Sequence, residues 1–256
     1  MKSRGLCGGL CILLLSILVA CSNRPDTLVE IQARGTLYIG LDPSYPPFEA
    51  LAPDGALYGL DVDLGRELAH RLGVGASFVL VGYDGLYDAL SVGQTDVLIS
   101  ALVVEPARME DVEYSVSYFD SGLVLVTTSD RVERIMEMED LAGRTVAVEY
   151  ATEADVEARR WARRLGDLAL LPLATADEAL AAVLGGKADA ALVDRVSARL
   201  YLRDHSGLGL SPEPVTSLPY AVAVRSGDRS LLHALDSALE EMAAEGLLET
   251  LLARWL

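Results

Sequence analysis

Two charged side chains, Arg108 and Asp194, follow expected strands and could bind the charged groups of a small molecule. Arg108 follows the expected strand 96–102, and a guanidinium there could grip a carboxylate with two parallel hydrogen bonds. Asp194 comes directly after the apolar run 190–193, and the carboxyl ends of strands are where α/β sheets generally bind ligands. Asp189 is the competing acidic residue on this strand, but its position favours the turn that starts the strand. These residue types suit the capture of a small charged molecule.

Motifs for several kinds of catalysis are missing from the sequence. It contains no G-x-x-x-x-G-K-[ST], G-x-G-x-x-G, H-E-x-x-H or G-x-S-x-G pattern, so nucleotide binding, zinc hydrolysis and esterase chemistry have no motif support. The histidines His70, His205 and His233 are dispersed, which favours ordinary surface roles over metal ligation. We therefore expect no catalytic residue, no metal and no cofactor.

The composition indicates a globular protein with a large aliphatic core. The chain has 256 residues, of which 51% are hydrophobic and only 6% aromatic. Its 38 acidic and 21 basic side chains give a formal net charge of −17. Such a balance does not support binding to nucleic acid, because a phosphate-binding surface needs clustered Lys and Arg.

The first 21 residues have the layout of a secretory signal. Lys2 and Arg4 precede the apolar run 10–20, which is shorter than the ~20 residues that span a bilayer. The sequence Leu18-Val-Ala-Cys21 resembles the lipobox of bacterial lipoproteins, in which the cysteine is lipidated and becomes the first mature residue. We expect a signal peptide over 1–20, a lipidated Cys21 with a tether over 21–34, and an extracytoplasmic location in the periplasm or at the cell surface.

From Gly35 onward, short β-rich runs alternate with helical patterns, as in an α/β fold with mostly parallel strands. Strands are expected over 37–41, 76–81, 96–102, 123–127, 145–149, 168–173, 190–193 and 218–224. Helices are expected over 61–72, 86–92, 153–165, 176–184 and 231–252, the last interrupted at Gly246.

A short internal repeat suggests that two lobes are built alike. Ala89-Leu-x-x-Gly93-x-x-Asp96 and Ala182-Val-x-x-Gly186-x-x-Asp189 share their spacing, and each reads as a helix, a glycine stop and a strand. The final strand and helix are expected to pack back on the first unit. This divides the chain into a first lobe (35–121 and 219–256) and a second lobe (122–218), joined by two crossovers that form a hinge around a cleft.

The sequence resembles the polar amino acid family of extracellular solute-binding proteins, the receptor subunits of ABC importers. The resemblance covers residues 35–256 and rests on segments that occur in the family's order and spacing. They are Gly40-Leu-Asp-Pro-Ser-Tyr-Pro-Pro-Phe-Glu49, Tyr58-Gly-Leu-Asp-Val-Asp-Leu64, Gly82-Tyr-Asp-Gly-Leu86, Glu105-Pro-Ala-Arg108, Tyr114-Ser-Val-Ser-Tyr118 and Asp140-Leu-Ala-Gly-Arg-Thr-Val-Ala-Val148. It implies a two-lobed, periplasmic-binding-protein-like fold of type II that binds a free amino acid between its lobes.

The resemblance also assigns roles to residues. It implies that Arg108 anchors the ligand carboxylate and that Asp194 accepts from the ligand ammonium group. The other residues implied to contact the ligand are Asp42, Tyr45, Tyr83, Ser100, Ala101, Val103 and Thr152. Tyr45 and Tyr83 match family positions whose aromatic rings lie on either side of the ligand side chain. Asp42 matches a family position that binds the polar or cationic end of that side chain.

Three positions depart from the family pattern. Ala151 replaces the usual glycine before Thr152, and alanine tolerates a positive φ poorly. Val103 and Glu105 stand where relatives commonly carry hydroxyl groups, although the N–H groups of Ala101 and Val103 can still donate. The Glu105 carboxylate could repel the ligand carboxylate or compete for Arg108.

The sequence thus predicts a lipid-anchored, monomeric receptor that captures a polar L-amino acid and hands it to an ABC importer permease. The acidity fits a basic ligand. Two alternatives remain open. One is an enzyme resembling the cyclohexadienyl, prephenate or arogenate dehydratases, with Glu105 or Glu149 as general acid. The other is an accessory protein that senses a ligand without transport.

Overall fold

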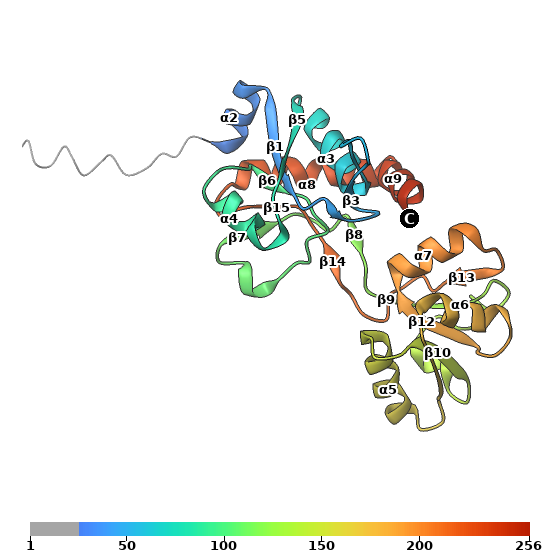
Figure 1. Cartoon of the computed structure of the whole chain (residues 1–256). Helices are drawn as coiled ribbons and strands as arrows, with labels where there is room; N and C mark the ends of the chain where they lie inside the picture. The colour runs from blue at the N-terminus through green and yellow to red at the C-terminus, as the bar shows by residue number, and fades with distance from the viewer. Residues whose placement is uncertain (1–25) are drawn as a thin grey trace, which may run out of the picture.

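The computed structural model describes residues 26–256, which form two lobes, each built on a five-stranded sheet. Figure 1 shows the lobes joined by two crossing segments. This confirms the expected two-lobed α/β fold. The signal sequence and Cys21 lie outside the described residues.

The first lobe takes its elements from both ends of the described chain. Its sheet has the strand order β5-β1-β6-β15-β7. These strands are β1 (Thr36–Leu41), β5 (Gly75–Leu80), β6 (Val97–Leu98), β7 (Val112–Tyr114) and β15 (Ala223–Arg225). A small separate sheet contains β2 (Ser44–Tyr45), β3 (Glu49–Leu51) and β4 (Leu57–Tyr58). The helices of this lobe are α2 (Thr27–Arg34), α3 (Leu60–Arg71), α4 (Leu86–Ser91), α8 (Arg229–Ala244) and α9 (Leu247–Trp255), with 3-10 turns at Tyr83–Gly85 and Pro106–Arg108.

The second lobe is continuous in sequence. Its sheet has the order β11-β10-β12-β9-β13. The strands are β9 (Leu123–Thr128), β10 (Thr145–Glu149), β11 (Ala169–Leu173), β12 (Ala190–Asp194) and β13 (Leu208–Leu210). The helices are α5 (Glu153–Leu165), α6 (Ala176–Leu184) and α7 (Arg195–Asp204), with a 3-10 turn at Met138–Leu141.

The expectation of mostly parallel pairing is wrong for part of each sheet. Strands β5, β1 and β6 run parallel to one another, as do β11, β10 and β12. The neighbouring strands β15 and β9 run antiparallel to β6 and β12. Each of these two strands enters its lobe directly from a crossing segment instead of through a helix, so it runs in the opposite direction.

The internal repeat is matched by equivalent contacts in the two lobes. The N–H of Asp96 donates to the Tyr38 carbonyl, and an Asp96 carboxylate oxygen accepts from the Tyr38 N–H. Asp189 makes the same pair of bonds with Thr145. Both aspartates therefore brace the start of a strand, so Asp189 acts in the turn and not in the cleft.

The two crossing segments pair with each other at the hinge. Strand β8 (Phe119–Asp120) is antiparallel to β14 (Pro219–Tyr220), and Figure 1 shows them side by side between the lobes. One carboxylate oxygen of Asp120 accepts from the Gly122 and Leu218 N–H groups, each at 2.8 Å, and the other accepts from the Ser217 hydroxyl at 2.6 Å. A Cβ atom on Gly122 would lie 1.8 Å from the Thr216 carbonyl oxygen, so only glycine permits this close approach.

The expected strand 218–224 is divided into β14 and β15, because the chain between them passes from the hinge into the first sheet. The expected strand 96–102 is reduced to β6. Its continuation turns at Ala101, which has a φ of 45°. Both differences occur next to the cleft, where tertiary contacts determine the backbone.

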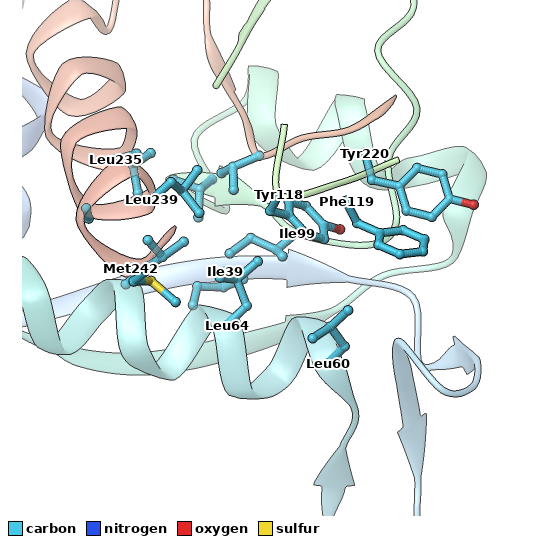
Figure 2. Packing of buried hydrophobic residues seen from close by; sticks show 14 of the residues in the cluster. Ile39, Leu60, Leu64, Ile99, Tyr118, Phe119, Tyr220, Leu235, Leu239 and Met242 are labelled. Carbon is cyan, nitrogen blue, oxygen red and sulfur yellow. The ribbon is translucent and has the colours of Figure 1, made fainter. Parts of the chain in front are cut away.

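Aliphatic side chains fill both faces of each sheet. In the first lobe, Figure 2 shows Ile39 and Ile99 of the sheet region packed between Leu64 of α3 and Leu239 and Met242 of α8. Tyr220 lies at the edge of this cluster, with its hydroxyl directed away from the α8 side chains (Figure 2). None of the helices within residues 26–256 combines the length and apolar character needed to cross a membrane.

Candidate functional site

Two adjoining cavities lie where the lobes face each other. The hinge cavity, of about 220 Å³, is lined by residues of the crossing segments and of the second lobe, including Thr152 and Asp194. The first-lobe cavity, of about 310 Å³, is lined by Asp42, Tyr83, Glu49 and the segment after β6. Tyr45 and Tyr220 line both cavities, so the two form neighbouring parts of one cleft.

Aromatic rings form the boundary between the cavities. The Tyr45 ring is stacked on Phe48, with centroids 5.5 Å apart, and it remains 46% exposed. Tyr220 meets the same Phe48 ring edge-on at 5.4 Å and is buried. Phe48 thereby supports an exposed aromatic face that a ligand side chain could cover.

Asp42 and Tyr83 are held together at the mouth of the first-lobe cavity. Asp42 directly follows β1, and its carboxylate accepts from the Tyr83 N–H at 2.9 Å. The Tyr83 side chain is 47% exposed. Its pKa is raised, first by partial burial and then by the Glu105 carboxylate, while Arg108 opposes the shift. An acidic group and an aromatic face therefore stand side by side.

The floor of this cavity contains Ser100, Ala101 and Val103. The Ser100 hydroxyl accepts from the Asp42 N–H at 3.0 Å and donates to Glu49 at 2.7 Å. The Ala101 N–H donates to Asp61, so it is already engaged, contrary to the expectation that it is available to a ligand. The backbone of Val103 forms a single antiparallel β-bridge with the backbone of Tyr220.

Two buried carboxyl groups are hydrogen-bonded to Ser100 and Ala101 of this floor. Glu49 is 1% exposed and Asp61 is fully buried, and the Tyr118 hydroxyl donates to Asp61 at 3.0 Å. Burial raises the pKa of both groups, and the negative charge of Asp61 raises that of Glu49 further. The cavity therefore has a protonatable group at its base.

On the second lobe, Asp194 and Thr152 begin helices that point at the hinge cavity. Asp194 ends β12, and one of its carboxylate oxygens accepts from the Ser197 N–H at 2.8 Å. The Thr152 hydroxyl donates to the Glu149 carbonyl at 2.8 Å and caps α5. Ala151 has a φ of 63° and donates its N–H to Asp155, so alanine occupies the left-handed conformation that suits glycine.

Arg108 is not among the residues that line either cavity. Its Nε is 3.1 Å from a carboxylate oxygen of Glu105, and its guanidinium carbon is 4.1 Å from the centre of the Tyr87 ring. Arg108 and Glu105 are 45% and 41% exposed, so both are at the rim. Glu105 thus engages Arg108, as its position in the sequence suggested.

The structure brings most of the expected residues to this cleft but leaves Arg108 at its edge. Asp42, Tyr45, Tyr83, Ser100, Ala101 and Val103 line the first-lobe cavity, whereas Thr152 and Asp194 join Tyr45 at the hinge cavity. Glu49 and Tyr220 also line the cleft, and neither is among the ligand-contacting residues expected from the sequence. An acidic residue inside the apolar run 48–51 could have indicated Glu49, and the strand crossing the hinge could have indicated Tyr220.

The charges of the cleft favour a cation. Asp42 lines one cavity, and Glu149, Glu153 and Asp194 line the other. The charged side chains that line these two cavities are therefore acidic, and Arg108 is paired with Glu105 outside the two linings. Within residues 26–256, no three His, Cys, Asp or Glu side chains gather in a way that could hold a metal ion.

Several known proteins are similar to this chain. The L-cystine-binding protein of Escherichia coli (strain K12) is 30% identical over 232 residues, which cover 89% of this chain and 85% of that protein. The crystal structure of an ancestral cyclohexadienyl dehydratase superposes with a TM-score of 0.78 at 27% identity, covering 91% of this chain and 98% of that one. The L-cystine solute receptor of Neisseria gonorrhoeae, in its unliganded open conformation, gives a TM-score of 0.76 at 25% identity, with coverages of 89% and 96%.

A family model also matches residues 37–256, which include both sheets, the hinge and every residue of the cleft described above. With its two α/β lobes and a cleft between them, the chain belongs to the bacterial extracellular solute-binding proteins, family 3.

Proposed function

We propose that this protein is an extracytoplasmic receptor that captures a polar, basic L-amino acid and delivers it to the permease of an ABC importer. The observation that carries the proposal is the cleft itself, in which Tyr45 lines both cavities together with acidic residues of both lobes. The family and the cystine-binding relatives support a free amino acid as ligand. In this proposal Cys21 carries the lipid that anchors the receptor.

The proposed mechanism is closure of the hinge around the ligand. Asp194 of the second lobe accepts from the ligand ammonium group, and Arg108 of the first lobe pairs with its carboxylate. Tyr45 and Tyr83 cover the side chain, and Asp42 binds its cationic end. A ligand that bridges the lobes binds the closed form better than the open one and therefore shifts the population toward closure.

In this mechanism, the ligand carboxylate must compete with Glu105 for Arg108. Arg108 must exchange the Glu105 carboxylate for that of the ligand before it can act as an anchor. Because both side chains are exposed to solvent, their pair is weak, so a ligand carboxylate can displace the Glu105 carboxylate.

The test is a thermal-shift screen of the purified protein against the common L-amino acids, followed by calorimetry with the best of them. We expect a basic amino acid to raise the melting temperature most. The Arg108→Ala variant should lose that binding while the melting temperature of the unliganded protein stays nearly unchanged, because the ion pair that is lost is exposed to solvent. Full affinity in this variant would contradict the role of Arg108.

A dehydratase is the alternative function, and the similarity to an ancestral cyclohexadienyl dehydratase is the observation that favours it. Glu149 lines the hinge cavity and is the carboxyl group that could serve as general acid there. Incubation of the protein with prephenate distinguishes the two functions. Turnover that is lost in Glu149→Gln would support the enzyme, whereas ligand binding without product supports the receptor.

A further inference from the structure

We propose that Glu49 and Asp61 share a single proton at neutral pH, and that this proton fixes the Ser100–Ala101 segment at the floor of the first-lobe cavity. Glu49 belongs to β3 and Asp61 to the first turn of α3. Glu49 accepts from the Ser100 hydroxyl and Asp61 from the Ala101 N–H, so both act on the cavity floor as positioning residues. The inference concerns the protein without ligand and does not depend on the function proposed above.

The first observation is a pair of oxygen atoms without partners. Within residues 26–256, Glu49 Oε2 and Asp61 Oδ1 are buried and have no hydrogen-bond partner. The remaining oxygens are occupied: Glu49 Oε1 accepts from Ser100, and Asp61 Oδ2 accepts from the Ala101 N–H and the Tyr118 hydroxyl. Burying two ionised carboxylates, each with one oxygen that has no hydrogen-bond donor, would carry a large free-energy cost. A single proton between the two groups would give both of these oxygens a partner.

The hydrogen bonds also indicate which group carries the proton. Asp61 receives two donors, which stabilise its ionised form, whereas Glu49 receives only the Ser100 hydroxyl. We infer that Glu49 holds the proton and shares it with Asp61, to which its side chain is hydrogen-bonded. The direction of the pKa shift agrees, because burial and the Asp61 charge both raise the pKa of Glu49.

The surroundings contain nothing that would neutralise a second negative charge. The titratable groups that face the pair are Asp42, which raises the pKa of Glu49 further, and Tyr118. In the described part of the chain, neither carboxyl group forms an ion pair with a Lys, Arg or His side chain. Loss of the shared proton would thus leave two unbalanced charges under the cavity.

The pair controls the cavity through the backbone above it. Asp61 holds the N–H of Ala101, whose φ of 45° is one that alanine rarely adopts. Glu49 holds the Ser100 hydroxyl, which in turn accepts from the Asp42 N–H. Repulsion between two ionised carboxylates would release these bonds, so the positions of Asp42, Ser100 and Ala101 depend on one proton.

Urea unfolding of the whole protein between pH 6.5 and 8.5 tests the shared proton. An ordinary glutamate is ionised in the unfolded chain at these pH values, whereas the folded protein keeps Glu49 protonated, so raising the pH favours unfolding. The Glu49→Gln variant carries a permanent donor instead. We expect the unfolding equilibrium constant of the wild type to rise by about tenfold per pH unit relative to that of Glu49→Gln.

The matched control is Glu240→Gln, which changes an exposed glutamate of α8 and should follow the wild-type profile. Parallel profiles for the wild type and Glu49→Gln would overturn the proposal. If Glu49→Gln does not fold, carboxyl ¹³C NMR of the wild type decides the question directly. A glutamate that remains protonated at pH 7.5 supports the shared proton, and a spectrum with every carboxyl group ionised refutes it.

Amide hydrogen exchange tests the positioning role separately from stability. The Ala101 N–H should exchange faster in Glu49→Ala and recover its protection in Glu49→Gln, because the amide side chain restores the donor to Asp61. The buried amide of Val148 in the second lobe serves as the internal reference for global unfolding. Equal protection of Ala101 relative to Val148 in all three proteins would contradict the positioning role.

Discussion

The Asp120 carboxylate holds the hinge together, and its removal should weaken the whole molecule. Asp120→Ala deletes the acceptor of three hydrogen bonds, those from the Gly122 and Leu218 N–H groups and from the Ser217 hydroxyl. A hydrogen bond to a charged group contributes about 1.5–3 kcal/mol when its partner is buried. Ser217 and Leu218 are exposed and can turn to water, so we expect a total loss of about 3 kcal/mol.

Urea unfolding followed by circular dichroism measures this loss, and Asp120→Asn is the matched variant. The asparagine carbonyl can still accept from both N–H groups, so its cost should stay near 1 kcal/mol at pH 7. A loss below 1 kcal/mol in Asp120→Ala would refute the idea that this side chain clamps the two crossing segments.

The pH dependence provides a second check on Asp120. Burial acts to raise the pKa of Asp120, but the bonds from Ser217, Leu218 and Gly122 outweigh it and lower the pKa below the ordinary value. The folded protein therefore binds this proton less readily than the unfolded chain. The stabilisation is present above about pH 4 and is lost as the pH falls through the lowered pKa. The difference between wild type and Asp120→Asn should shrink accordingly, and a difference that stays constant down to pH 2.5 would contradict the assignment.

Two further substitutions test the backbone around the cleft. Gly122→Ala would place a Cβ atom 1.8 Å from the Thr216 carbonyl oxygen, so it should destabilise the protein by about 1–3 kcal/mol in urea unfolding. An unchanged urea midpoint of unfolding would show that the backbone of the hinge shifts to accommodate the Cβ atom without loss of stability. Ala151→Gly should instead stabilise the protein by about 1 kcal/mol, because it relieves the φ of 63° while the Asp155 bond remains. A lower melting temperature in differential scanning calorimetry would count against strain at Ala151.

Elements with strong local signals were predictable from sequence. The helix over 153–165 was predicted with the bounds that the structure shows, because Thr152 caps its start and Gly166 ends it with a φ of 84°. Gly246 likewise separates α8 from α9 with a φ of 73°. In these cases a residue and its immediate neighbours determine the backbone, so one sequence is sufficient.

Features that depend on distant partners were not predictable in the same way. The antiparallel strands β9 and β15 follow from the route of the chain through the hinge. The burial of Glu49 depends on Asp61, Ser100 and Tyr118, which come from three other parts of the sequence. Similarly, the sequence does not show that the Arg108 guanidinium lies over the Tyr87 ring, 4.1 Å from its centre. Motif spacing identifies such residues without showing which neighbour engages them.

The strand order of the first sheet has a consequence for the time at which each lobe can form during synthesis. Strand β15, near the end of the chain, lies between β6 and β7. The strands of the second sheet are all contained within residues 123–210. A growing chain can therefore complete the second sheet while the first still lacks an interior strand. We expect a chain stopped before residue 223 to contain a finished second lobe and an open first sheet, so the lobe synthesised first is the last to be completed.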